Sequence, residues 1–79
     1  MPRQVTISSN LGAVIAGFTE REKANLVKAI DLMESIGRIG EPLFLDMNVW
    51  KYRVDNLRII YRMINEEIRV IKIMKGMKI

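Results

Sequence analysis

The chain contains neither cysteine nor histidine, and these two absences exclude several kinds of functional site. Without cysteine there is no disulfide and no thiolate metal ligand. Without histidine the usual zinc ligand and the usual general base are missing. The sequence also has no glycine-rich phosphate loop and no nucleophile elbow. We therefore expect neither a metal nor a cofactor, and any catalysis would depend on other side chains.

Long apolar segments are also absent from these 79 residues. The apolar stretch from Leu11 to Phe18 is far shorter than the roughly 20 residues that cross a bilayer, and the N-terminus has no signal-peptide pattern. We expect a soluble, cytoplasmic protein without a membrane partner. One domain, 1–79, accounts for the length.

A domain of this size has a limited interior, because a chain of about 60 residues buries only about 60% of its unfolded surface. The sequence is nevertheless 49% hydrophobic and contains six methionines. Some apolar surface should therefore stay outside the core. A bound partner protein or a second copy, giving a homodimer, would cover it.

Positive charge is concentrated in the last part of the chain. Residues 1–47 hold five basic and six acidic side chains, a net −1, whereas residues 48–79 hold eight basic and three acidic, a net +5. The stretch from Val49 to Met74 is therefore the main source of positive potential.

The first half of the sequence predicts a strand and a helical hairpin. Residues Arg3 to Ser8 are rich in β-branched side chains and suit an edge strand. A short helix should follow, because Leu11 to Phe18 has apolar residues at helical spacing but also two glycines. Thr19 and Glu22 then form a capping-box pattern, which begins a second helix that Gly37 should end. The apolar stripe expected on this helix is Leu26, Val27, Ile30, Met33 and Ile36.

The last third predicts three antiparallel strands joined by tight turns at Asp55-Asn56 and Asn65-Glu66. Counting outward from the first turn pairs Arg53 with Arg58. Further residues pair in the same way: Val54 with Leu57, Tyr52 with Ile59, Lys51 with Ile60, and Trp50 with Tyr61. Counting from the second turn pairs Met63 with Ile68, Arg62 with Arg69, Tyr61 with Val70, and Ile60 with Ile71. This count places Lys72 on the apolar side, so either its stem reaches an edge or the second turn is longer.

Alternation gives this sheet two different faces. The core face should contain Trp50, Tyr52, Val54, Leu57, Ile59, Tyr61 and Met63. The opposite face should contain Lys51, Arg53, Arg58 and Arg62, interrupted by Val49 and Ile60. Directly opposed arginines destabilise a sheet unless an anion lies across them, and a polyanion such as RNA would gain from several contacts together. A solvated, charged face that prevents aggregation explains the same pattern, so both interpretations remain open.

At the level of residues, the segment from Trp50 to Ile73 resembles the RelE/ParE superfamily of toxins from bacterial and archaeal toxin–antitoxin pairs. The segment reads WKYRV, a turn, LRIIYR, a second turn and IRVIKI, preceded by the helical hairpin. This resemblance implies an α+β domain in which an N-terminal strand and two helices pack on a small, mostly antiparallel sheet with a basic face.

The resemblance also implies an activity and partners. RelE-like members cut mRNA in the ribosomal A site, using lysine and arginine to promote attack of the ribose 2′-hydroxyl on the adjacent phosphate. ParE-like members inhibit DNA gyrase instead, and a cognate antitoxin wraps the toxin in both branches. We favour the RelE-like branch, a metal-independent endoribonuclease that inhibits translation. A gyrase inhibitor and a non-toxic relative serving as a small binding domain are the alternatives.

Particular positions take on roles through this resemblance. The basic pair of the RelE-like strand falls on Lys51 and Arg53, which would hold the phosphate or, for Lys51, accept the 2′-hydroxyl proton. Arg58 would stabilise charge on the phosphorane. RNA-binding positions would be Arg62, Arg69, Lys75 and Lys78.

The end of the sequence departs from the family pattern. RelE-like chains usually follow the last strand with a Gly-His-Arg turn and a tail tyrosine, whereas this chain reads Met74-Lys75-Gly76-Met77-Lys78 and then Ile79. Lys75 or Lys78 would supply the lost cation, but the sequence offers no evident acid for the leaving group. This tail is compatible with a weakened, divergent or inactive member of the family.

Overall fold

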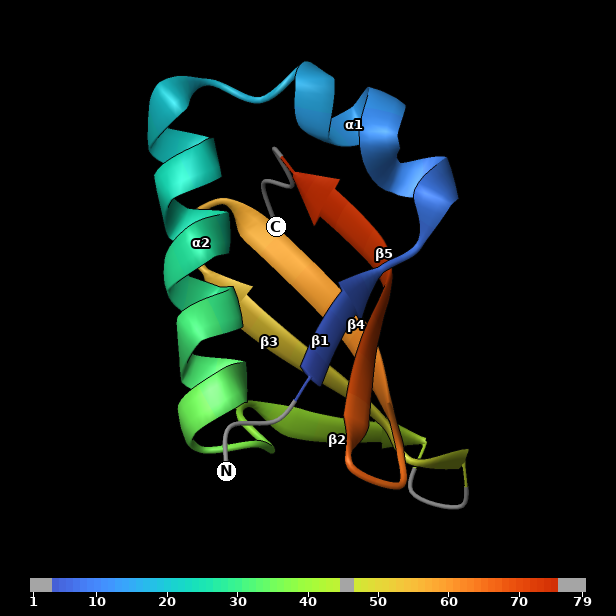
Figure 1. Cartoon of the computed structure of the whole chain (residues 1–79). Coiled ribbons are helices and arrows are strands. Elements are labelled where there is room, and N and C mark those ends of the chain that lie inside the picture. The colour runs from blue at the N-terminus through green and yellow to red at the C-terminus, as the bar shows by residue number, and fades with distance from the viewer. Residues whose placement is uncertain (1–3, 45–46, 76–79) are drawn as a thin grey trace.

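The computed structural model describes residues 4–44 and 47–75, in which two α-helices and a mixed sheet are arranged as two layers (Figure 1). The strands are β1 (Gln4–Ile7), β2 (Glu41–Phe44), β3 (Val49–Val54), β4 (Leu57–Ile64) and β5 (Glu67–Lys75). The helical segments are a 3-10 turn (Ser9–Leu11), α1 (Gly12–Ala16) and α2 (Glu20–Ser35). The strand order is β1-β5-β4-β3-β2, in which β1 pairs parallel with β5 and the other neighbours are antiparallel. The predicted α+β class is confirmed.

Helix α2 begins at the predicted capping box. The Thr19 hydroxyl accepts a hydrogen bond from the backbone N–H of Glu22 at 3.1 Å, and the Glu22 carboxylate accepts one from the N–H of Thr19 at 2.8 Å. Gly37 follows the helix with φ 96°, a conformation that glycine adopts without strain. No helix in residues 4–44 and 47–75 is long and apolar enough to cross a membrane.

The side of α2 that faces the sheet differs from the predicted apolar stripe. Leu26, Ala29 and Met33 are buried, whereas Val27 and Ile36 are 57% and 60% exposed. The prediction for Val27 and Ile36 was wrong because α2 buries only a narrow stripe, and the small Ala29 lies at its centre. The core between α2 and the sheet consists of Leu11, Phe18, Leu26, Ala29, Met33, Leu57, Ile59, Tyr61, Ile68, Val70 and Ile73.

The register of β3 with β4 is the one counted from the sequence. All five predicted pairs are present, including Arg53 with Arg58, and the ladder extends to Val49 with Arg62. The first residue of each turn, Asp55 and Asn65, has φ of 56° and 57°, a left-handed conformation that Asp and Asn tolerate better than most residues. Both predicted turns are therefore confirmed.

The pairing of β4 with β5 contains a β-bulge that the sequence did not predict. Tyr61 pairs with Val70 as expected, but Ile60 pairs with Lys72, so Ile71 has no partner and the predicted pair of Ile60 with Ile71 is wrong. An extra residue shifts the alternation by one position. Ile73 is consequently buried in the core and Lys72 is exposed on the other face.

Glu22 joins three parts of the chain that are distant in sequence. Besides capping α2, its carboxylate accepts hydrogen bonds from the Asn56 side chain at 2.7 Å and from the Lys75 ammonium at 3.2 Å. These contacts connect the start of α2, the β3–β4 turn and the end of β5. The Asn56 amide, the Thr19 N–H and Lys75 together lower the pKa of Glu22 from 4.5 to about 2.

This lowered pKa predicts a pH-dependent contribution to stability. A carboxyl whose pKa is lower in the folded state stabilises the fold above its unfolded pKa, and the contribution is lost as the pH falls through the folded value. Glu22→Gln should therefore reduce the free energy of unfolding at pH 7. The difference from wild type should shrink between pH 4.5 and about 2. Urea unfolding at several pH values measures this.

Glu20→Gln is the matched control, because Glu20 is an acid in the same first turn of α2 and is exposed. It should change stability little at any of these pH values. A difference between Glu22→Gln and wild type that stayed constant down to pH 2 would contradict the assigned cause.

Candidate nucleic-acid interface

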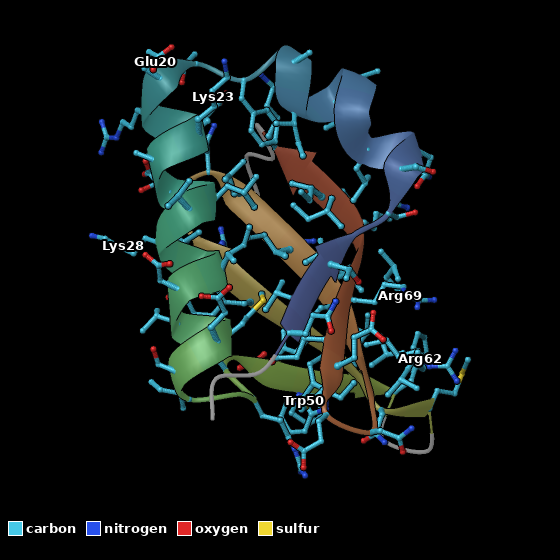
Figure 2. All side chains as sticks on the ribbon, viewed as in Figure 1. Glu20, Lys23, Lys28, Trp50, Arg62 and Arg69 are labelled. Atoms are coloured by element: carbon cyan, nitrogen blue, oxygen red, sulfur yellow. The ribbon has the colours of Figure 1, made fainter. Side chains whose placement is uncertain are left out.

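Six cationic side chains occupy the sheet face opposite α2, and we call this surface the basic face. Their neighbours along the strands, such as Leu57, Ile59 and Ile68, are buried beneath α2, so alternation directs the cations the other way. In Figure 2, Arg62 and Arg69 project from the side of the sheet away from the helix, whereas Lys23 and Lys28 lie on α2. The basic face consists of Lys51, Arg53, Arg58, Arg62, Arg69 and Lys72.

Register places like charges opposite one another on this face. Arg53 pairs with Arg58, and Arg62 pairs with Arg69, as the sequence predicted. Like charges at directly opposed positions of a sheet are destabilising, by up to roughly 1 kcal/mol on the scale of cross-strand pairs. An anion lying between the members of a pair would remove this repulsion.

The charges of the basic face are only partly neutralised. Lys51 lies 3.8 Å from a Glu41 carboxylate oxygen, and Arg69 lies 3.5 Å from Glu67. Arg62 donates instead to the backbone carbonyl of Met47. Within residues 4–44 and 47–75, Arg53, Arg58 and Lys72 form no ion pair with a carboxylate. These three cations remain available to an external anion.

A shallow hollow of about 320 Å³ lies at one end of the basic face. Its lining brings together the three residues proposed for chemistry, Lys51, Arg53 and Arg58, with Gly40, Glu41 and Tyr52. The predicted catalytic residues therefore share one concave site, large enough for a phosphate group. The two arginines that line it are an opposed pair.

The close approach of two chain segments shapes the wall of this hollow. Gly40 has φ 86°, and a Cβ built at this position would lie 2.0 Å from the backbone oxygen of Lys51. No residue larger than glycine fits there without moving β3 or the segment before β2. This contact brings the start of β2 against Lys51, and Glu41 pairs directly with Lys51 in the sheet.

The remaining predicted cations do not all join the basic face. Lys75 pairs with Leu57 in register and therefore lies on the helix side, where its ammonium contacts Glu22, the Gly17 carbonyl and the Phe18 ring. Lys78 lies outside the described residues.

Two residues of the site were missed at the level of sequence. Lys72 was placed on the apolar side because the bulge at Ile71 was not anticipated, although its misfit there was a signal of an irregular register. Glu41 was not singled out in the sequence. Its position beside Lys51 depends on pairing of β2 with β3, for which the short sequence of β2 gave no pattern.

The aromatic residues of the sheet are mainly structural. Tyr61 is fully buried, and its hydroxyl donates to the Ile39 carbonyl and accepts from the Ile39 N–H at 2.7 Å. Burial raises the pKa of Tyr61, so the phenol stays protonated at neutral pH. Trp50 and Tyr52 are partly buried against the core, and Tyr52 also reaches the edge of the hollow.

The chemistry that the hollow offers comes from a small set of side chains. Its lining supplies three cations, one carboxylate and one phenol. Residues 4–44 and 47–75 contain no group of three acidic side chains that could hold a metal ion.

Comparison with solved structures identifies the fold. The chain superposes on a chain of the crystal structure of the toxin–antitoxin complex RelBE2 from Mycobacterium tuberculosis with a TM-score of 0.77 and 20% sequence identity. The match covers 96% of this chain and 93% of that one. The protein therefore has the RelE-like fold that the sequence resemblance implied. No family model and no curated protein matched the sequence.

Substitution of Gly40 tests the local geometry of the hollow. Gly40→Ala should lower the free energy of unfolding by at least about 1–2 kcal/mol, because a left-handed backbone alone costs an L-residue about that much and the methyl group also meets Lys51. Thermal or urea unfolding measures the change.

Gly12→Ala is the matched control, since its Cβ would have no atom within 4 Å and its backbone is right-handed helical. This control should raise stability by up to about 1 kcal/mol. Equal effects of the two substitutions would contradict the close approach.

Proposed function

We propose that this protein is the toxin of a toxin–antitoxin pair and cuts mRNA on the ribosome without a metal ion. The observation that carries the proposal is the hollow in which the opposed residues Arg53 and Arg58 lie beside Lys51. The RelE-like fold supports it, since a structure with this fold is part of a toxin–antitoxin complex.

The hollow suits the transition state of phosphodiester cleavage by the ribose 2′-hydroxyl. Attack of the 2′-oxygen on phosphorus places additional negative charge on the equatorial oxygens, and cations fixed before the reaction stabilise that charge. Arg58 and Arg53 would donate to these oxygens, while Lys51 would contact the bridging or leaving oxygen. The products would be a 2′,3′-cyclic phosphate and a free 5′-hydroxyl.

The rest of the basic face would bind the RNA backbone on either side of the cut. Arg62 and Arg69 lie further along the strands, and Lys72 lies beside Ile60 in the middle of the sheet. Contacts with phosphates release counterions, which gives binding a strong dependence on salt. We assign Lys72 to this surface, whereas Lys75 belongs to the structural contact with Glu22.

A partner protein is also part of the proposal. Large apolar side chains are exposed on both layers, among them Phe44 at 55%, Met47 at 50% and Val27 at 57%. In a small domain such surface is commonly covered by another chain. An antitoxin would cover it and mask the basic face. A homodimer is the other occupant, and co-expression with the neighbouring reading frame followed by light scattering distinguishes the two.

Arg58→Ala tests the catalytic assignment. Because removal of a single donor to developing charge costs about 100-fold to 1,000-fold in other enzymes, mRNA cleavage should fall by at least about 100-fold. Mapping of mRNA ends after addition of the purified protein to translating ribosomes measures the rate. Lys28→Ala, which removes an exposed cation from α2, should cut at the wild-type rate.

Two outcomes would overturn this function. Growth arrest with intact mRNA and inhibited supercoiling by gyrase would favour the ParE-like alternative. Harmless expression of a protein that still binds its partner would favour a non-toxic binding domain.

Lys72→Ala tests the extent of the RNA surface. Its affinity for a short single-stranded RNA should fall, and the slope of log affinity against log salt should decrease by about 0.7, the contribution of one phosphate contact. Lys28→Ala is again the control, because it removes the same positive charge from α2. A slope unchanged by Lys72→Ala would remove this residue from the RNA surface.

A further inference from the structure

Residues 38–40, which lead from the end of α2 into β2, form one wall of the hollow, and we call them the wall segment. Gly40 lines the hollow, and the space that a Cβ would need there is occupied by the backbone of Lys51 and Tyr52. The strand β2 starts at the next residue and pairs with β3 at Lys51. The position of the wall segment therefore determines the shape of the hollow beside Lys51.

A tyrosine from the core side of the sheet holds the wall segment in place. Tyr61 is fully buried in the core, and its hydroxyl accepts a hydrogen bond from the Ile39 N–H at 2.7 Å and donates one to the Ile39 carbonyl. One hydroxyl group is thus the partner of both backbone groups of Ile39. Because Ile39 is half-buried, loss of this partner would leave both groups poorly satisfied.

A second aromatic residue holds the wall segment one position earlier. Trp50 pairs directly with Tyr61 across β3 and β4, and the guanidinium carbon of Arg38 lies 5.7 Å from the centroid of the Trp50 ring. Cations are attracted to the face of an indole ring at this distance. Trp50 lies near β2 at the lower end of the sheet (Figure 2). Adjacent aromatic residues therefore hold consecutive residues of the wall segment.

We propose that Tyr61 is a positioning residue for cleavage, because its hydroxyl fixes the wall segment and thereby the space around the Lys51 ammonium. Tyr61 is buried and would not contact the RNA. It acts through the Ile39 backbone on Gly40, which lies against the backbone of Lys51. A displacement of about 1 Å at a reacting centre lowers a rate by roughly 100-fold, so a small movement of the wall matters. This inference rests on the proposed function.

A purely structural role for the Tyr61 hydroxyl is the competing explanation. In that case its removal would lower the stability of the whole domain and leave the folded protein fully active. A positioning role predicts a folded protein in which the wall segment has moved. Cleavage would then be slow, whereas RNA binding would be retained, because every cation of the basic face is still present.

Tyr61→Phe tests this role, since it removes the hydroxyl and keeps the ring. Single-turnover cleavage of mRNA on translating ribosomes should fall by about 10-fold to 100-fold. Affinity for a short single-stranded RNA should stay near the wild-type value. Trp50 is the single tryptophan of the sequence, so its fluorescence reports on the wall segment. Quenching of this fluorescence by acrylamide should increase, because Arg38 would no longer cover the ring.

Ile73→Val is the matched control, because it also weakens the core but lies on β5, which β4 and β3 separate from β2. It should cleave near the wild-type rate with unchanged quenching. If Tyr61→Phe does not fold, the exposed substitution Arg38→Ala loosens the same segment. It should slow cleavage by up to about five-fold, the equivalent of an exposed cation–π contact. Lys28→Ala, with the same loss of charge, should cleave at the wild-type rate.

The possible results separate this inference from the function on which it rests. Cleavage by Tyr61→Phe at the rate of Ile73→Val would overturn the positioning role and leave the endoribonuclease proposal standing. Unchanged tryptophan quenching, or a parallel loss of cleavage and RNA affinity, would overturn the role as well. An absence of cleavage by wild type would overturn the endoribonuclease proposal, and the quenching alone would then decide whether Tyr61 holds the wall segment.

Discussion

Alternation of apolar and polar side chains along β3, β4 and β5 is the constraint on which the molecule depends. Two turn residues with left-handed backbones, Asp55 and Asn65, set the registers of these strands. A slip of one residue would exchange the two faces, placing arginines under α2 and core residues such as Ile59 and Ile68 in solvent. The bulge at Ile71 belongs to the same constraint, because it corrects the phase of β5 so that Ile73 enters the core and Lys72 leaves it. The same strand pairing therefore determines both which side chains form the core and which form the basic face.

The local parts of the fold could be predicted from the sequence, because neighbouring residues determine them. The capping box at Thr19 and the pairs around the Asp55-Asn56 turn involve residues a few positions apart, and all of them are present. The bulge, the burial of Ala29 in place of Val27, and the role of β2 depend on packing between distant segments. Sequence periodicity alone carries no information on how closely a helix approaches a sheet.

The candidate site also combines residues that could be predicted from local sequence with residues that could not. Lys51, Arg53 and Arg58 could be grouped in advance, since they lie on adjoining strands of one hairpin. Glu41 could not, because it reaches the hollow through a glycine contact with a strand that begins several residues later. In the site that we propose, cations in opposed pairs would stabilise the negative charge of the reaction without a histidine. The RelE-like fold accommodates this arrangement in a chain that shares 20% identity with its structural neighbour.

The contact among Glu22, Asn56 and Lys75 determines when during synthesis the protein can finish folding. Glu22 and Lys75 are 53 residues apart in the chain, and β1 pairs with β5 from the opposite end of the sequence. On the ribosome that makes this protein, α2 emerges long before β5 and must wait with its apolar stripe uncovered. Contacts of such long range slow folding and extend the lifetime of aggregation-prone forms. The protein can therefore close its core and assemble its basic face only after β5 has left the ribosome. If the proposed cleavage is its activity, this order keeps the nascent chain inactive until β5 has emerged.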